Sequence, residues 1–592
     1  MTSHSAQSTD DPRPARPDPR SSDSSERPGP GTPPPQWWSR LALSIPGCWV
    51  ALLFACLSFL PSLIPRPSLF QGALAGASAA IGYGLGVFGA WLWRALADRE
   101  PHPTTDRQLR VLALVAPVAL VAAVIMGVFW QRWSAPLVGL EPESPLAAIL
   151  VLPVAVLVLL LILGIGRLLR ALTRLVTRWL GRHMGPRPAR VLGAIAVITA
   201  VALLFNGVIF DRLTVAVNSV FSLSNGGTPE DLSAPTSPLR SGSPESAIEW
   251  DTLGFQGRGF VAQGPGATQI AAVAERSGHP AQETMDPIRA YAGLDSAPDV
   301  ESRALLAVQD LERAGGFERS HLLVVTTTGT GWVEPTSVSA FEHLTLGDSA
   351  TVSMQYSFLP SPLSFIADKD NARNAGRALF DAVYNRWSQL PADSRPQLYA
   401  FGESLGSYGA EAAFSGEYDM SNRLSGAVFT GPPRFNHHFG EFLRDREPGS
   451  TEIAPVYRDG RTVRFTQDPR LPAEPVDQPW EGTRVLYMVH PSDAITWWST
   501  DLMLHRPDWL EEPRGSDVPD QTRWVPFVTF WQVSADLGLA MEPGPGYGHN
   551  FAGEHVDAWA QVLGLEDWTP ERAAVIREAV LNKARDPFVP SS

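Results

Sequence analysis

Long uncharged apolar windows dominate the first third of the chain, and short apolar runs between amphipathic stretches dominate the rest. Five windows contain no charged residue: 41–64, 67–93, 111–131, 144–166 and 191–210. Each has at least 20 residues, enough for a helix to cross a hydrocarbon core of about 30 Å. The pattern therefore predicts five transmembrane helices.

The arginines predict how these helices are oriented. Sixteen of the 18 arginines before residue 211 lie before residue 41, in 94–110 or in 167–190, and only Arg66 and Arg132 lie in the other connections. Cytoplasmic connections are usually the ones rich in positive charge. We therefore expect a multi-pass protein of the cell membrane with a cytoplasmic N-terminus. An odd number of spans places the remainder on the outer side.

Composition divides the chain into four parts. Residues 1–36 are rich in Pro, Ser, Asp and Arg, which predicts a disordered tail. We assign 37–225 to a transmembrane domain, the Gly/Pro/Ser-rich segment 226–249 to a linker, and 250–592 to a second domain. From residue 211 onward the chain has 29 basic and 51 acidic residues, a balance that argues against nucleic acid as a partner.

Strands alternate with helices along the second domain. Short apolar runs separated by amphipathic helices indicate a doubly wound, mostly parallel sheet covered on both faces, the α/β class. The predicted strands are 288–292, 321–327, 351–356, 397–401, 426–429 and 484–489.

A short motif at the end of one predicted strand is typical of a nucleophile. Gly402-Glu403-Ser404-Leu405-Gly406 lies between the apolar run 398–401 and a helical stretch. This order of strand, tight turn and helix is the nucleophile elbow of α/β-hydrolases, in which glycines relieve a strained turn. Ser404 is thus the candidate catalytic nucleophile.

A serine hydroxyl needs a base, and the base needs an orienting acid, in the chain order Ser, Asp/Glu, His. Asp493 follows the late apolar run 484–489 and is the candidate acid. Asp501 is the runner-up, but we expect it inside the following helix. His549 lies in the Gly-rich loop 544–550 and is the candidate base.

Two backbone N–H groups are expected to form an oxyanion hole. One is that of Leu405, directly after the nucleophile. The other is assigned to Thr328, with Gly329 next, because a Gly-rich turn follows the strand 321–327. The segment 434–480 is rich in Pro and charge, and either a lid over the site or a surface loop fits it.

No metal and no cofactor are predicted. His437-His438 is the pair that suggests a metal, but adjacent side chains diverge and we see no acidic or Cys partner at ligand spacing. Both cysteines, Cys48 and Cys56, lie in the first apolar window, so the second domain has no cysteine ligands.

Together these motifs resemble an actinobacterial family of membrane-bound α/β-hydrolases, with a multi-span N-terminal domain and a C-terminal catalytic domain. The resemblance covers roughly residues 40–585 and implies that Ser404, Asp493 and His549 are the catalytic residues. It leaves the substrate open. The stretches that carry it are 327–332, 402–407, 490–493 with Trp497-Trp498, and Gly548-His549.

The expected function is that of a membrane-anchored serine hydrolase of the esterase or lipase type. It would act through an acyl-enzyme on an ester, with an envelope lipid as one candidate. Its expected partners are this acyl ester or lipid and the membrane lipids. Two alternatives stay open: an acyltransferase with the same three residues, and an inactive membrane scaffold or sensor. A transporter is disfavoured because the five windows contain no charged residue or histidine.

Overall fold

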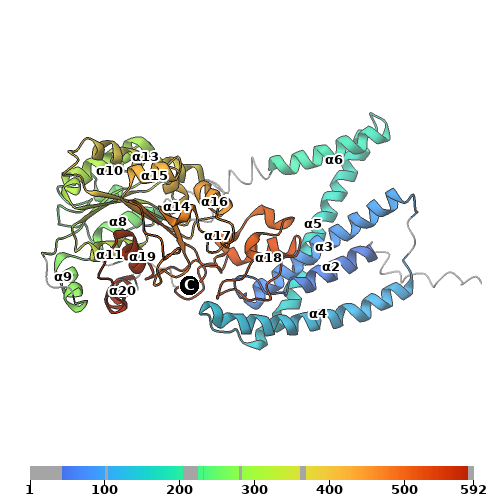
Figure 1. The fold of residues 1–592 in the computed structure, drawn as a ribbon. Coiled ribbons are helices and arrows are strands. Elements are labelled where there is room, and N and C mark those ends of the chain that lie inside the picture. Colours follow the sequence, from blue (N-terminus) through green and yellow to red (C-terminus); the bar gives the residue numbers. More distant parts are fainter. Residues whose placement is uncertain are drawn as a thin grey trace, which may run out of the picture.

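The computed structural model describes residues 43–100, 104–204, 224–230, 232–278, 283–360, 364 and 369–584. The tail 1–36 predicted to be disordered, and the end of the fifth window from 205 onward, lie outside these residues. A bundle of long helices occupies one end of the molecule, and an α/β part occupies the other (Figure 1).

Among the described residues, four helices are long and apolar enough to cross a membrane by length and composition. They are α3 (Ser68–Leu96), α4 (Asp106–Ser134, continued by η1 Ala135–Val138), α5 (Val151–Leu180, preceded by η2 Pro145–Leu150) and α6 (Pro186–Leu203). The shorter α2 (Ile45–Leu57) packs against α3.

The prediction for the first window was wrong in extent. α2 has 13 residues, which at 1.5 Å per residue span about 20 Å and do not reach across a core of about 30 Å. Pro61, Pro65 and Pro67 follow, and proline removes a helical hydrogen bond. Leu63 and Ile64, each 1% exposed, belong instead to the hydrophobic core of the α/β part.

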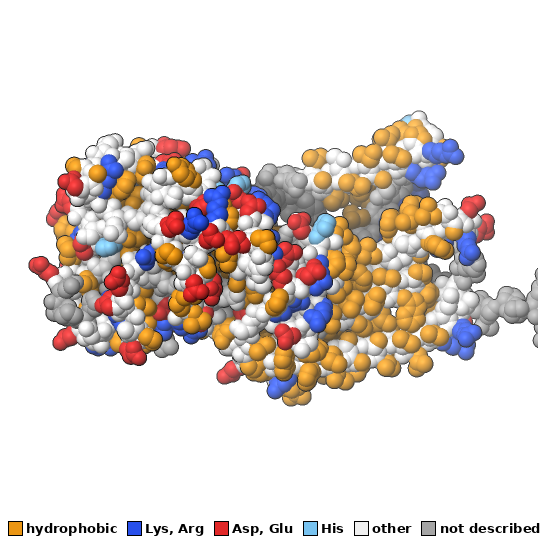
Figure 2. Space-filling model, in the orientation of Figure 1, with side chains coloured by type: hydrophobic (Ala, Val, Ile, Leu, Met, Phe, Trp, Pro, Cys, Tyr) orange, Lys and Arg blue, Asp and Glu red, His pale blue; other side chains and the backbone are white. Residues whose placement is uncertain are grey.

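The connections of the bundle lie at two opposite ends. The α3–α4 and α5–α6 connections lie away from the sheet, whereas the α2–α3 and α4–α5 connections lie against the α/β part (Figure 1). In the space-filling view, hydrophobic side chains cover much of the helices, and Lys and Arg side chains gather at the far end (Figure 2). The arginine-rich connections and the sheet thus lie at opposite ends of the apolar bundle.

In the described part of the chain, seven parallel strands form one sheet in the order β1-β3-β2-β4-β5-β7-β6, which confirms the predicted α/β class. Their side chains are almost entirely buried, as in parallel sheets covered on both faces. The strands are β1 (Ile288–Ala292), β2 (His321–Thr326), β3 (Ser349–Met354), β4 (Gln397–Glu403), β5 (Gly426–Thr430), β6 (Val463–Thr466) and β7 (Arg484–Met488).

β6 was not predicted. It has only four residues and alternates two apolar with two polar side chains, too short a pattern to stand out. It lies inside the segment 434–480, so this segment supplies an edge strand of the sheet as well as surface structure.

Helices cover both faces of the sheet (Figure 1). One face carries α10 (Val300–Arg313), α13 (Lys369–Ser388), α14 (Leu405–Glu411), α15 (Glu417–Arg423) and α16 (His437–Arg444). The other carries α8 (Gly254–Ala262), α9 (Ala267–Arg276), α11 (Pro335–Leu344), α19 (His555–Leu563) and α20 (Pro570–Ala584).

Part of the predicted linker packs on the α/β part. The backbone of Arg240 forms an isolated parallel β-bridge with Arg289 of β1, and Ser241 Oγ donates to Asp310 of α10 at 2.5 Å. This stretch therefore extends the α/β part and does not hang free between two units.

A buried ion pair joins the helical bundle to the α/β part. Helix α18 (Val528–Leu537) lies beside the α2–α3 connection. Its Asp536 contacts Arg66 (Nη1 to Oδ1, 2.8 Å) and accepts the backbone N–H of Leu63 at 3.2 Å. Both charged side chains are 0% exposed. The contact is therefore part of the core and not a surface pair.

Candidate active site

Ser404 occupies a strained turn between β4 and α14. Its φ of 53° and ψ of −124° are unfavourable for a residue with a side chain, and its N–H donates to Thr430 O at 2.9 Å. The flanking glycines are required by space. A Cβ on Gly402 would lie 2.5 Å from Gly406 O, and one on Gly406 would lie 2.5 Å from Thr326 O. The turn has the geometry of a nucleophile elbow.

His549 and Asp493 are brought together across 56 residues of sequence. His549 Nδ1 lies 2.7 Å from Asp493 Oδ2, and both side chains are buried. The carboxylate also accepts the hydroxyl of Thr496 at 3.0 Å and the N–H of Ile495 at 2.8 Å. Because a carboxylate accepts, Nδ1 carries the hydrogen, and Nε2 of the neutral ring is left as a buried acceptor without a partner among the described residues.

The imidazole lies next to the elbow. A Cβ on Gly431 would be 2.4 Å from His549 Cε1, so the ring lies directly over this glycine. Gly431 follows Thr430, the residue whose carbonyl holds Ser404. Ser404 and the His549–Asp493 pair thus lie at the carboxyl ends of the neighbouring strands β4, β5 and β7. In the described part of the chain, Ser404 Oγ and His549 Nε2 form no hydrogen bond; such contacts are often long without substrate.

Asp501, the runner-up acid, lies elsewhere. It is exposed in η7 (Thr500–Met503), and its carbonyl accepts the N–H of His505. The structure therefore brings Asp493, and not Asp501, to His549.

The two predicted oxyanion donors differ in whether their backbone N–H groups already have an acceptor. Leu405 begins α14, where a backbone N–H has no partner within the helix, and no other acceptor is found in the described chain. Thr328 is not supported, because its N–H donates to Trp332 O at 3.0 Å. This bond closes the Gly-rich turn. The N–H of Gly329 has no such acceptor among the described residues, so our second choice fits better.

Burial and nearby carboxylates set the pKa of His549. Burial lowers it, but the charge and hydrogen bond of Asp493, together with the charge of Glu403, outweigh burial and leave the pKa raised above 6.5. Glu403, inside the elbow, is itself buried, and burial raises its pKa to about 7. Its Oε2 lies 3.4 Å from His555 Nε2.

His490 holds the loop that carries His549. Its Nδ1 lies 2.8 Å from the carbonyl oxygen of Gly548, and its Nε2 lies 2.8 Å from Glu554 Oε2. Since both partners accept, the ring is doubly protonated. Burial lowers the pKa of His490, but the contact with Glu554 outweighs burial and raises it. On the other side, Gly548 N–H donates to Ser492 Oγ at 2.8 Å.

Sequence reasoning did not assign Glu403, His490, Glu554 or His555 to the site. The available signal was proximity: Glu403 lies inside the elbow, His490 lies three residues before Asp493, and His555 lies six residues after His549. Of these residues, His490 contacts the loop of His549 and Glu554 contacts His490, and no motif marks either contact.

A cavity of about 580 Å³ lies behind the His549 loop. His490, Glu554 and Tyr547 line it, whereas Ser404 and His549 do not. It is therefore separate from the place where the elbow would meet a substrate.

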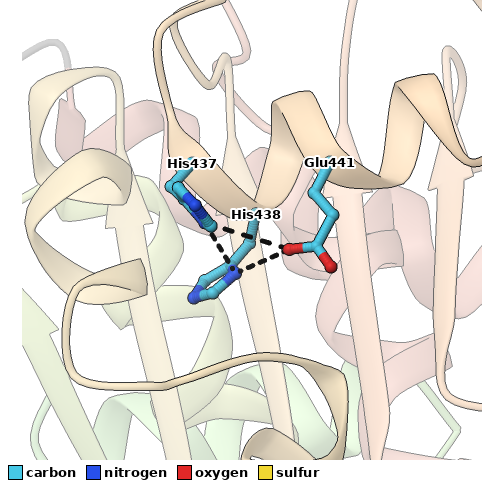
Figure 3. A group of neighbouring side chains, drawn as sticks. All are labelled: His437, His438 and Glu441. Carbon is cyan, nitrogen blue, oxygen red and sulfur yellow. Dashed lines mark hydrogen bonds and ion pairs between the residues drawn. The ribbon is translucent and has the colours of Figure 1, made fainter.

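The argument against a metal at His437-His438 was wrong on geometry. The two side chains converge, and Glu441 joins them one helical turn later (Figure 3).

Comparison with known sequence families agrees with the fold. Residues 288–576 match an alpha/beta-hydrolase family, and residues 59–265 match the N-terminus of an alpha/beta-hydrolase family. The chain belongs to this α/β-hydrolase family, and membership supports a hydrolase-type function. The two matches together include both the long apolar helices and the sheet. No curated protein and no solved structure matches the chain.

Proposed function

We propose that the protein is a membrane-anchored serine hydrolase that cleaves an ester through an acyl-enzyme. The observation that carries the proposal is the buried Nε2 of His549, which has no hydrogen-bond partner among the described residues. Asp493 fixes the ring from its other side, and the ring lies over Gly431 beside the elbow. Serine catalysis requires an oriented base with one ring nitrogen free to take the proton of the hydroxyl.

In the proposed mechanism, Ser404 Oγ attacks the ester carbonyl while His549 Nε2 takes the hydroxyl proton. Asp493 stabilises the imidazolium that forms. The N–H groups of Leu405 and Gly329 stabilise the oxyanion. When the tetrahedral intermediate collapses, the C–O bond to the leaving alcohol breaks, and His549 returns the proton to that alcohol. Water then attacks the acyl-serine with the same base, which releases the acid and regenerates Ser404.

The substrate we propose is an ester of a membrane lipid, met at the outer face of the cell membrane. Two contacts support a site close to the bilayer. Gly544, in the loop of His549, donates its N–H to Val138 O at the end of η1 (3.0 Å). Gln532 of α18 donates to Leu60 O at 2.9 Å. Both acceptors lie in connections at the sheet-facing end of the apolar bundle.

Labelling with a fluorophosphonate probe tests the catalytic assignment. Membranes that contain the wild-type protein should become labelled, and Ser404→Ala, present at equal abundance, should not. Ser394→Ala, at an exposed serine, is the matched control and should label like the wild type. Equal labelling of Ser404→Ala and wild type would overturn the assignment.

Comparative lipid analysis tests the substrate. Membranes that carry the active protein should lose one ester lipid class relative to membranes that carry Ser404→Ala. A new ester in place of the free acid would instead identify an acyltransferase.

Orientation is tested by Ser394→Cys, because the natural cysteines lie in the apolar helix α2. An impermeant maleimide should label this cysteine in intact cells, and labelling only after lysis would place the sheet inside.

A further inference from the structure

Three potential metal ligands converge at the start of α16 (Figure 3). His437 Nδ1 and His438 Nδ1 lie 3.4 Å apart. Glu441 Oε2 lies 3.5 Å from His438 Nδ1 and 3.9 Å from His437 Nδ1. The three atoms therefore form a nearly regular triangle.

The size of this triangle fits a tetrahedral ion. Zinc lies about 2.0–2.2 Å from nitrogen and oxygen ligands, so the ligands of a regular tetrahedron are about 3.3–3.6 Å apart. Neighbouring ligands of octahedral magnesium, at about 2.0–2.1 Å, would be only about 3.0 Å apart. The observed separations of 3.4 and 3.5 Å fall within the tetrahedral range, and the third, 3.9 Å, involves the exposed ring of His437 and is longer; all three are closer to a tetrahedral face, which leaves the fourth position open, than to an octahedral one.

The hydrogen bonds of His438 leave its Nδ1 ready to bind a cation. The side chain is buried, and its Nε2 lies 2.9 Å from the carbonyl oxygen of Phe414. A carbonyl only accepts, so Nε2 carries the hydrogen and Nδ1 of the neutral ring has a lone pair. This lone pair faces the other two ligand atoms. A carbonyl that holds the outer nitrogen of a ligating histidine is the usual arrangement at metal sites.

The rest of the triangle is accessible from solvent. The side chain of His437 is 80% exposed and that of Glu441 is 34% exposed, so an ion can reach the position without unfolding the helix. Two imidazole nitrogens and one carboxylate oxygen are a donor set that suits zinc and related transition metals better than magnesium or calcium.

The site lies where α16 meets the elbow helix α14. The backbone N–H of His438 donates to Glu411 of α14 at 3.1 Å, and Asn436 Nδ2 donates to Ser407 Oγ and to Glu411 Oε1, each at 3.0 Å. Phe414 follows α14 by three residues. An ion on His438 would thus strengthen the contact of α16 with α14 without touching Ser404.

We propose that His437, His438 and Glu441 bind one divalent transition-metal ion, zinc in particular, with water in the fourth position. The role is structural, and the proposal does not depend on the serine mechanism. Binding should therefore persist in Ser404→Ala.

Metal titration of the full-length protein tests the proposal. The protein is purified in detergent with a tag that contains no histidine, stripped with a chelator, and titrated with zinc against a chromophoric competitor. We expect one ion per chain. His437→Ala and Glu441→Gln should each weaken binding by at least ~10-fold, since even indirect partners of ligands contribute ~10–100-fold.

Two further measurements make the outcome decisive. Cobalt bound to the wild type should show the strong visible absorption of a tetrahedral site, and zinc should raise the melting temperature of the wild type but not of the two variants. His505→Ala, at an exposed histidine outside the triangle, should bind like the wild type. His438 is buried and its replacement can disturb folding, so the test rests on the other two residues. Absence of stoichiometric zinc binding, or equal affinity of wild type and both variants, would overturn the proposal.

Discussion

Asp536 offers the sharpest test of how the helical bundle supports the site. The Asp536→Asn variant keeps the shape of the side chain and an oxygen for the N–H of Leu63, but it removes the charge that pairs with Arg66. Both side chains are 0% exposed, so the guanidinium is left buried without its counterion. Breaking a buried pair in this way costs about 3–5 kcal/mol.

We place the effect at the lower end, near 3 kcal/mol, because the asparagine oxygen still accepts a hydrogen bond. Since each 1.4 kcal/mol is a factor of ten, the interface should open roughly 100-fold more often. Asp536 lies four residues before Ala540, whose carbonyl accepts the N–H of His549 at 2.8 Å. The proposed esterase activity should therefore fall although Asp536 lies outside the set of proposed reacting groups.

Hydrogen exchange followed by mass spectrometry measures this opening in segments 58–66 and 540–550. Both should exchange faster in Asp536→Asn, whereas segments of β2 and β3 should not change. Asp508→Asn is the matched control, because Asp508 is 57% exposed in its pair with Arg446, and a surface pair contributes at most ~1 kcal/mol. Adding Arg66→Met to Asp536→Asn should restore protection, since no buried charge is then unpaired. Unchanged exchange and activity in Asp536→Asn would refute the reasoning.

Four further predictions concern the site and the buried carboxyl group of Glu334, which interacts electrostatically with Glu403 and His555. Asp493→Asn should lower the proposed esterase kcat by about 10³–10⁴-fold, because the required tautomer of His549 is lost. Glu403→Gln removes a charge that raises the pKa of His549, so the acidic limb of the kcat/KM profile should move to lower pH. An unmoved limb would contradict the influence of Glu403 on His549. Burial raises the pKa of Glu334 from 4.5 to about 7, so the folded state holds a proton that the unfolded chain releases. The stability of the wild type therefore falls as pH rises across this range. Denaturant unfolding should show that the stability of Glu334→Gln relative to wild type grows between about pH 5 and about pH 8. Gly406→Ala should destabilise by at least ~1–3 kcal/mol and abolish probe labelling, because its Cβ would lie 2.5 Å from a backbone oxygen, whereas Gly440→Ala, with 3.6 Å to its nearest neighbour, should be tolerated.

The sheet could be predicted because parallel strands buried on both faces leave continuous apolar runs in the sequence. Ser404 and its glycines could be predicted for a related reason: the strain of the turn restricts which residues fit. The extent of the first span could not. Leu63 and Ile64 are as apolar as membrane residues, and only the structure shows that they are buried in the core of the α/β part.

The groups that hold the loop of His549 could not be predicted from a sequence pattern. His490 and Glu554 meet across 64 residues, and neither spacing nor residue type marks them in advance. The bond of the Thr328 N–H to Trp332 O could not be predicted either, because the closure of this turn depends on local backbone geometry. The convergence of His437 with His438 also depends on side-chain rotamers, which a sequence does not specify.

The burial of Leu63 and Ile64 in the core of the α/β part has a consequence for the release of this protein from cells. A protease that cuts the chain between residues 204 and 224 severs the covalent path from α6 to the sheet but leaves both side chains and Arg66 in place. The two fragments should stay together in the membrane fraction. With the sheet at the proposed outer face, shedding it into the medium would require the removal of its own interior residues, and a single cut should not give a secreted form.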